Sequence, residues 1–544
     1  MLSHFLSIIM KNPAIILSLI LILSGFHESF SQNKEGLKIA LVYPEMTKRI
    51  LYKNDDSFKP TDPWELFFMS SGYKYEMVND NEIGSVGGDV NVIVIPGMEA
   101  ADDEIISEIE QAMQDNKGIL ITGSFAQFDG EGNKTIQDYS KRLLDFEIRR
   151  LTDSSAAVSH SLLANTAISI GMKPGEKILL SNKSSLFYTS DLHGDYNSLG
   201  KYFAGNDEYS GIITHNSSNS RLLWFGFAFD QLIGKNRNMV LFNSLKWLSS
   251  APEAFINYWP SDLSSAVLYY KKIEKISDID TSYSPQTGQE KINYFITPQI
   301  IGKSGDKLKL PGTVVNIDLI WDDFFFTGLS RTDALSWLDQ AKSSIDRFSK
   351  QDSYGILLYG EFYESDSNSL LNEEGYSFIF SSGYSDSFSF NYDSTNKVYR
   401  FIQTYAPGKN YESRMNFVLN SGGIFYADTD SLKNMVLSPS IDNKIWQTTF
   451  SELLDWVIKR SKLEVTFQSR GNDKYEIIIK NNSPSVVENA GIWISVPGLA
   501  NNLSLEYPGE AGDLTFDSGK KMYFLRVNSI GGYQRISYRI SAQM

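Results

Sequence analysis

The first folded part of the chain alternates short apolar runs with amphipathic segments. Three apolar runs have the length of strands: residues 37–43, 90–95 and 118–122. Unbroken runs of this kind are typical of parallel strands covered on both faces. Residues 102–116 place Ile105 and Ile109 on one face of a predicted helix, and Asp102 lies at its start, where negative charge is favoured. Strand, helix, strand predicts a βαβ unit, so we assign residues 37–250 to an α/β layer.

In the last part of the chain, hydrophobic and polar positions follow a different pattern. Residues 462–544 contain several short runs in which apolar and polar side chains often alternate, as in 474–480 and 534–540. Turn-forming residues separate these runs, for example between Asn481 and Pro484. This pattern predicts a C-terminal, immunoglobulin-like β-sandwich.

The N-terminal segment has the features of a secretory signal. Lys11 precedes an apolar core, Ala14–Leu23, and small residues at Ser29 and Ser31 follow it. We expect residues 1–31 to be removed after Ser31, and a retained membrane anchor is the alternative. No later stretch has membrane-spanning length, so we expect no membrane insertion after cleavage. The predicted location is outside the cytoplasm, in the periplasm, at the cell surface or secreted, and the absence of cysteine favours a bacterial protein.

Composition excludes several classes of function. Among the 544 residues, 50 basic and 65 acidic side chains give a net charge of −15. This charge argues against sequence-independent binding to nucleic-acid phosphates, so no nucleic-acid partner is expected. The absence of cysteine excludes disulfides, thiol nucleophiles and thiolate zinc sites. We expect no cofactor.

The α/β layer resembles the class I glutamine amidotransferase-like fold. The resemblance lies in the run that ends at Gly97, the turn Gly123–Gln127, and a closing helix over 238–249. It implies a flavodoxin-like parallel sheet in which the family's enzymes carry a nucleophilic Cys at a turn after a strand. Ser124 is the residue that could replace it here. The glycines of a nucleophile elbow are missing around Ser124, and we expect no catalysis at this position.

The middle of the chain, residues 255–460, resembles the polysaccharide deacetylases, a family of metal-dependent carbohydrate esterases. The matching features follow in order: Trp259–Pro260, the runs 265–270, 292–297 and 313–320, the helix 332–348, Tyr359–Gly360, Gly375–Tyr376, the run 421–426 and the helix 446–460. The resemblance implies a distorted (β/α) barrel with its chemistry at the C-terminal ends of the strands. The predicted fold class is therefore an α/β multidomain chain: an amidotransferase-like parallel sheet, a deacetylase-like barrel and a β-sandwich.

The residues that the deacetylase reaction needs are missing from this chain. The family holds a divalent metal with one Asp and two His, and uses a further His as the acid. Residues 216–544 contain no histidine. We therefore expect neither a catalytic residue nor a metal site. A carboxylate-only Ca²⁺ site at Asp318, Asp322 and Asp323 is the alternative, against solvated loop carboxylates.

Aromatic residues suggest a ligand groove at the predicted barrel mouth. The candidates that line it are Tyr269, Tyr270, Trp321, Asp322, Asp323 and Tyr359. Aromatic faces bury the apolar surface of sugars while acids bind hydroxyls. A mouth filled by bulky side chains is the alternative.

These observations favour an exported, non-catalytic protein of the cell envelope that binds a polysaccharide or an envelope protein. One alternative is a divergent polysaccharide deacetylase or other carbohydrate-active hydrolase. The other is a structural or secretion-linked scaffold.

Overall fold

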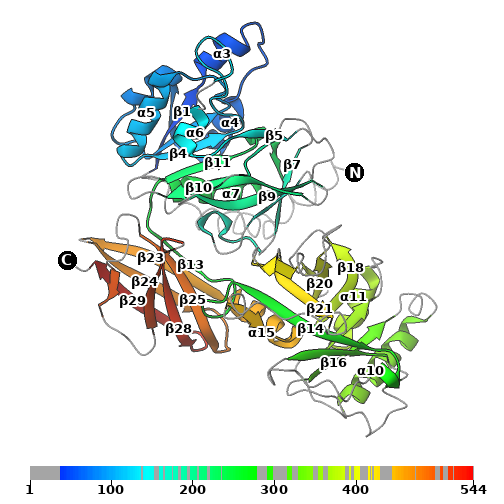
Figure 1. Ribbon diagram of the computed structural model, residues 1–544. Helices are drawn as coiled ribbons and strands as arrows, with labels where there is room; N and C mark the ends of the chain where they lie inside the picture. The colour runs from blue at the N-terminus through cyan, green and yellow to red at the C-terminus, as the bar shows by residue number, and fades with distance from the viewer. Residues whose placement is uncertain are drawn as a thin grey trace, which may run out of the picture.

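The computed structural model describes the chain from Leu37 to Ala542 with internal gaps. The residues outside it are 1–36, 136–138, 152–158, 163–165, 174–175, 182–185, 191, 193–195, 205–206, 217–220, 235, 279–290, 298–299, 301–314, 322–328, 347–352, 359–364, 386–390, 394–396, 405–414, 417, 420–421, 429–443, 472, 497–502, 507–511, 519 and 543–544. The predicted signal, residues 1–31, thus lies outside the described residues. The described part is mixed α/β, with several sheets (Figure 1).

The N-terminal layer is built on a ten-stranded sheet with the order β12-β7-β6-β9-β10-β11-β4-β3-β1-β2. Five strands are parallel: β1 (Lys38–Tyr43), β2 (Lys74–Asn79), β3 (Val92–Pro96), β4 (Gly118–Thr122) and β11 (Arg221–Phe225). The other five extend the sheet in antiparallel fashion: β6 (Ser159–Leu162), β7 (Lys177–Leu180), β9 (Tyr196–Ala204), β10 (Asp207–Asn216) and β12 (Leu232–Ile233).

The continuous apolar runs arise because both faces of the parallel strands are covered. Along β1, Ile39 and Leu41 enter one core and Ala40 and Val42 enter the other. The first core contains residues of α4 (Asp62–Ser71) and α7 (Arg237–Leu248), and the second contains residues of α5 (Asp103–Gln114). The predicted strands at 37–43, 90–95 and 118–122 are therefore present, and each is buried between helices.

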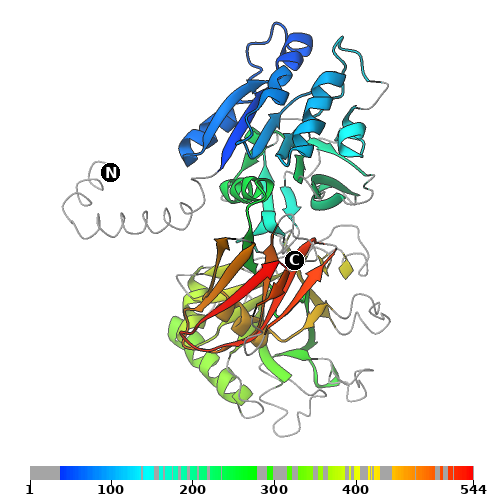
Figure 2. The same cartoon turned by 90° about the vertical axis from the view of Figure 1, so that its left-hand side faces the viewer.

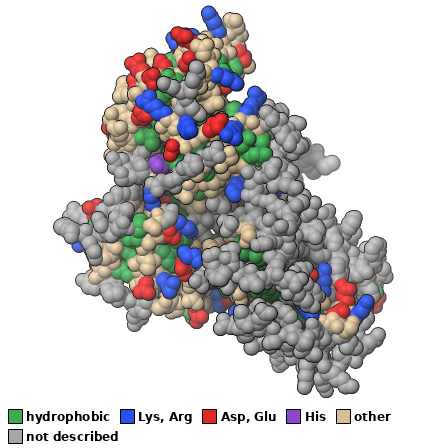
Figure 3. Space-filling view, in the orientation of Figure 1, with side chains coloured by type: hydrophobic (Ala, Val, Ile, Leu, Met, Phe, Trp, Pro, Cys, Tyr) green, Lys and Arg blue, Asp and Glu red, His purple; other side chains and the backbone are tan. Residues whose placement is uncertain are grey.

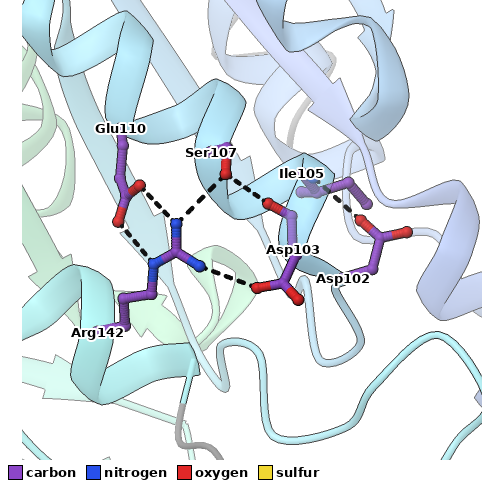
Figure 4. Close-up of polar contacts among 6 residues, drawn as sticks. All are labelled: Asp102, Asp103, Ile105, Ser107, Glu110 and Arg142. Carbon is purple, nitrogen blue, oxygen red and sulfur yellow. Dashed lines mark hydrogen bonds and ion pairs between the residues drawn. The ribbon is translucent and has the colours of Figure 1, made fainter.

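The start of α5 shows how the local sequence sets a helix end. Asp102 is the N-cap, and its carboxylate accepts a hydrogen bond of 3.0 Å from the backbone N–H of Ile105. Arg142, on α6 (Tyr139–Leu144), donates to both carboxylate oxygens of Glu110, at 3.0 and 2.8 Å, and to Asp103 at 2.9 Å (Figure 4). These exposed pairs join the two helices and contribute little to stability.

The middle of the chain forms a nine-stranded sheet with the order β19-β20-β18-β17-β16-β15-β14-β21, and β22 also pairs with β14. All neighbours are parallel except β19 (Asn391–Asp393). The parallel strands are β14 (Ser265–Ile273), β15 (Ile292–Ile296), β16 (Val315–Trp321), β17 (Gly355–Leu358), β18 (Phe378–Ser385), β20 (Val398–Thr404), β21 (Ile424–Asp428) and β22 (Ile445–Gln447). Within the described residues no ladder joins β20 to β21, so the sheet stays open and the predicted barrel is not closed.

The two faces of this parallel sheet carry different cores. One core contains residues of α10 (Arg331–Asp346) and α11 (Ser365–Glu373). The other core is rich in aromatic residues and includes Phe450, the first residue of α15 (Phe450–Arg460). Asn293 connects α15 to the sheet, because its side chain donates to the carbonyl of Tyr269 at 2.9 Å and accepts from the N–H of Phe450 at 3.0 Å.

The C-terminal part is a two-sheet antiparallel structure around one core. One sheet contains β13 (Glu253–Ile256), β25 (Val487–Ser495), β28 (Met522–Ile530) and β27 (Gly512–Asp517). The other contains β23 (Leu463–Gly471), β24 (Lys474–Asn481), β29 (Arg535–Ala542) and β26 (Leu503–Leu505). The predicted domain boundaries, 255–460 and 462–544, stay a prediction; β13, which begins before both in the chain, pairs with β25 and belongs to the C-terminal sheet. Figure 2 shows the sandwich strands below the N-terminal layer.

Short elements complete the described structure. They are the helix α3 (Glu45–Leu51), the two-stranded sheet of β5 (Arg149–Leu151) and β8 (Leu186–Tyr188), and the 3-10 helices η1 (Asp80–Ser85), η2 (Ala167–Ser169), η3 (Phe229–Gln231) and η4 (Ile276–Asp278). No helix of the described chain is long and apolar enough to span a bilayer.

Candidate functional site

The predicted groove residues of β14 lie in the interior of the protein. Tyr269 is 4% exposed and belongs to the core beneath α10, whereas Tyr270 is 3% exposed and belongs to the aromatic core on the opposite face. Neighbouring residues of a strand point to opposite faces, so these two side chains cannot line one groove.

The remaining groove candidates are not brought together by described side chains. Trp321 ends β16, where its backbone is in register with Leu358 of β17. Its side chain, and Asp322, Asp323 and Tyr359 entirely, lie outside the described residues. The same holds for the carboxylate of Asp318. The groove at the carboxyl ends of the strands therefore stays a prediction.

Aromatic side chains fill the space on the Tyr270 face of the sheet. The Tyr270 ring lies 5.0 Å from that of Phe380, measured between centroids. Phe450 is fully buried and its ring lies 4.9 Å from Phe378 and 5.3 Å from Phe401. Close-packed rings leave no room for a ligand at the level of these strands.

The position expected for an amidotransferase nucleophile has no catalytic partner in the described structure. Ser124 follows β4, and the left-handed backbone positions are its neighbours Gly123 (φ 75°) and Ala126 (φ 47°). The Ser124 side chain is buried and has no described hydrogen-bond partner. His215, on β10, stacks on Tyr196 with ring centroids 4.3 Å apart. The described residues also contain no group of three or more His, Cys, Asp or Glu able to hold a metal ion.

A hollow lies where the N-terminal layer, the parallel sheet and the sandwich meet. It consists of two adjoining cavities of about 380 and 540 Å³, which share Gly171, Met172, Tyr258, Arg460 and Ser461. We call it the junction cleft. The smaller cavity reaches the sandwich at Leu463 and Val465, and the larger one reaches the sheet at Ser377 and Tyr399. Helix α15, which ends at Arg460, lies between the sandwich and the parallel sheet (Figure 1).

Arg460 is held firmly at the wall of the junction cleft. Its Nε donates to the carbonyl of Asn257 at 2.8 Å and its Nη2 donates to the carbonyl of Ile256 at 3.1 Å. The guanidinium carbon lies 4.6 Å from the centroid of the Tyr258 ring, a cation–π geometry. Burial lowers the pKa of Arg460 from its ordinary value. No described carboxylate forms an ion pair with Arg460, and its Nη1 has no described partner.

Neighbouring side chains fix the backbone that carries this arginine. Helix α15 begins with a capping box, in which Thr449 accepts from the N–H of Glu452 at 3.2 Å and Glu452 accepts from that of Thr449 at 3.1 Å. Near its other end, Trp456 donates to the carbonyl of Tyr258 at 2.9 Å. Asn257, 1% exposed, donates to the carbonyls of three loop residues: Trp259, Ser261 and Leu263.

The lining of the junction cleft is basic. Among the described residues of its lining four are cationic and none is Asp or Glu: the four are Lys173, Lys397, Arg460 and Lys462. The nearby Glu176 accepts from the backbone N–H of Lys173 at 3.1 Å. The contrast with the rest of the protein is clear, because the chain carries a net charge of −15 and the described surface of its N-terminal layer mixes both signs (Figure 3).

Sequence reasoning missed this cleft. Tyr258 and Arg460 are separated by about 200 positions, and neither lies in a motif with chemical meaning. Trp259–Pro260 was the nearest feature that the sequence indicated, and it marks the start of the middle domain rather than a site.

No family model and no curated protein matches this chain. Solved structures with partial likeness include a β-galactosidase from Bacillus circulans sp. alkalophilus, with 10% identity over 39% of this chain and 30% of that one, and a TM-score of 0.31. A protein described as a GMP synthase subunit, from Thermoplasma acidophilum, has 14% identity over 40% of this chain and 96% of that one, with a TM-score of 0.28.

An α-L-fucosidase isoenzyme 2 from Paenibacillus thiaminolyticus has 7% identity over 95% of this chain and 50% of that one, with a TM-score of 0.26. This chain therefore spans about a third of the β-galactosidase and half of the fucosidase. Likenesses at these TM-scores carry no argument about function.

Proposed function

We propose that this protein is an exported, non-catalytic component of the bacterial cell envelope that binds a carbohydrate in the junction cleft. The observation that carries the proposal is the cleft itself, a hollow between three parts of the fold with Tyr258, Tyr399, Ser377 and Arg460 in its wall. Ligand sites occur preferentially at such domain interfaces and have comparable volumes. Aromatic rings offer a flat apolar face for a sugar ring, and the hydroxyl and guanidinium groups offer hydrogen bonds.

The absence of catalysis is the second part of the proposal. The order of motifs resembles a deacetylase and an amidotransferase, yet the histidines and the cysteine that those reactions need are missing from the sequence. The aromatic packing around Tyr270 and Phe450 supports the same interpretation for the sheet interior. On this proposal, the protein derives from carbohydrate-active ancestors; it has kept the ability to bind a carbohydrate and has lost the ability to catalyse a reaction on it.

Replacing Tyr399 tests the proposal. Tyr399 lines the larger cavity and is only partly buried, so Tyr399→Ala removes an aromatic face with modest damage to the core. We expect residues 32–544 to bind one or more envelope-type oligosaccharides on a glycan array, and Tyr399→Ala to weaken calorimetric affinity by about tenfold, as for loss of one stacking ring. Tyr533→Ala is the matched control, because Tyr533 is 72% exposed and does not line the cleft.

Two results would contradict this function. Release of acetate from acetylated chitin or peptidoglycan fragments by the pure protein would establish an enzyme. Capture of one envelope protein, with no signal on any glycan, would establish a scaffold.

A further inference from the structure

We infer that the ligand of the junction cleft is an acidic saccharide, whose carboxylate or sulfate group is bound by Arg460. The inference rests on the proposed function and narrows its ligand class. Three features of the described part of the cleft support it: a partly buried cation with no counter-ion there, a lining whose charged side chains are all basic, and an adjacent aromatic surface.

The first feature is the unpaired charge of Arg460. Two of its nitrogens donate to the carbonyls of Asn257 and Ile256, which are neutral acceptors. Nη1 has no partner among the described residues, and it belongs to a side chain that lines both cavities. A charge that is drawn out of water without a counter-ion is costly. A planar anion in the cleft would supply the missing acceptor, and the fork of donors on arginine matches carboxylate and sulfate geometry.

The second feature is the set of lysines around this arginine. Lys397 and Lys462 are exposed at the rim of the larger cavity, and Lys173 lines it as well. Like charges that surround a hollow raise the local concentration of anions. The charges of Lys397 and Lys462 add to that of Arg460 in the same lining, so an anion is the natural occupant.

The third feature distinguishes a sugar from a simple anion. Ser377 and Tyr399 lie in the same wall as Arg460, and Met172, Leu454 and Val457 supply apolar surface beside them. An inorganic ion needs no apolar or aromatic surface. A sugar acid would use the apolar surface and the cation together, with its ring packed against the apolar wall and its charged group bound by Arg460.

Calorimetry with matched ligands tests the inference. The probes are a galacturonic acid trimer, its fully methyl-esterified form, a sulfated disaccharide and an oligoglutamate peptide. We expect the galacturonate or the sulfated sugar to bind, the neutral ester to bind at least about tenfold more weakly, and affinity for the acidic sugar to fall with added salt.

Two variants locate the binding charge. Arg460→Gln removes the charge and should reduce affinity for the acidic sugar by about tenfold or more while leaving the weak binding of the ester unchanged. Because this change also alters the contacts that hold the Asn257 segment, a surface variant is used as well: Lys397→Gln with Lys462→Gln should reduce affinity about fivefold at low salt. Lys480→Gln, an exposed lysine outside the cleft, is the control.

Each result has a separate meaning. Equal affinity for the trimer and its ester, or no effect of either variant, overturns the acidic ligand but leaves carbohydrate binding intact. Tighter binding of oligoglutamate than of any sugar also overturns it. Failure of all sugars, neutral and acidic, overturns the proposed function itself.

Discussion

Asn257 shows how one buried amide can join separate parts of this chain. Its Nδ2 donates to the carbonyls of Trp259, Ser261 and Leu263, and its Oδ1 accepts from the indole of Trp493 at 3.1 Å. We expect Asn257→Ala to lower the free energy of unfolding by about 3 kcal/mol, because it leaves buried polar groups without partners. Urea denaturation followed by tryptophan fluorescence measures this, and Asn54→Ala, at an exposed position, should change stability by under about 0.5 kcal/mol.

The sequence predicts local roles of residues better than remote ones. Asp102 was expected at a helix start, and it caps α5, because the cap and its N–H partner are three positions apart. The role of Asn257 depends on Trp493, which is 236 positions away. The partners of Arg460 are equally remote. Periodicity contains no information about such contacts, so the sequence did not indicate the junction cleft.

Helix α15 is the element on which the position of Arg460 depends. A helix was predicted over 446–460, and the structure begins it at Phe450, because Ile445–Gln447 pairs with β14 and Thr449 provides the cap. We expect Thr449→Ala to destabilise the protein by about 1 kcal/mol through loss of this cap. Thr449→Ser keeps the hydroxyl and should restore most of the loss. Equal denaturation midpoints for all three proteins would show that the cap has no role.

Strand β13 shows why element boundaries were the harder part of the prediction. The predicted α/β layer ends at residue 250 and the predicted middle domain begins at residue 255, so no strand was expected over 253–256, whereas the structure pairs Phe255 with Trp493 of the sandwich. Strand β13 has four residues, and no hairpin turn connects it to its partner strand. A strand of this kind carries no local sequence signal that shows which sheet it joins. The long runs at 265–270 and 292–297 were assigned correctly, because their length and apolar character suffice.

The N-terminal layer is joined to the sandwich by a buried guanidinium group. Arg221 of β11 donates to the carbonyl of Trp247 at 2.6 Å and to the hydroxyl of Ser495 on β25 at 3.1 Å. Glu253 of β13 accepts a hydrogen bond from Lys246 at 3.2 Å, and its other carboxylate oxygen is buried without a partner. Burial lowers the pKa of Arg221 to about 10. These charged groups connect β11, the end of α7 and the C-terminal sheet. The sequence alone did not predict that these three segments are in contact.

Glu253 should make the stability of this junction depend on pH. Burial raises the pKa of Glu253 above its usual value, and the charges of Lys246 and Arg221 offset part of the effect. The folded state therefore holds the proton at pH values where the unfolded chain, with a pKa of about 4.3, has released it. The contribution of Glu253 to the free energy of unfolding is therefore fully present at acidic pH, and it is lost as the pH rises through the raised pKa. Glu253→Gln cannot ionise and should lack this dependence.

The measurement is the melting temperature of wild type minus that of Glu253→Gln, followed from pH 4 to pH 8. We expect this difference to become more negative as pH rises, because only the wild type must bury a carboxylate. Glu464→Gln, at an exposed position of β23, is the matched control and should give a nearly constant difference. A difference for Glu253→Gln that is flat, or that grows in favour of wild type, would mean that Lys246 and Arg221 compensate the buried charge fully. Only a difference that grows in favour of wild type would further mean that an ion pair formed at neutral pH stabilises this junction, and that its contribution is lost in acid.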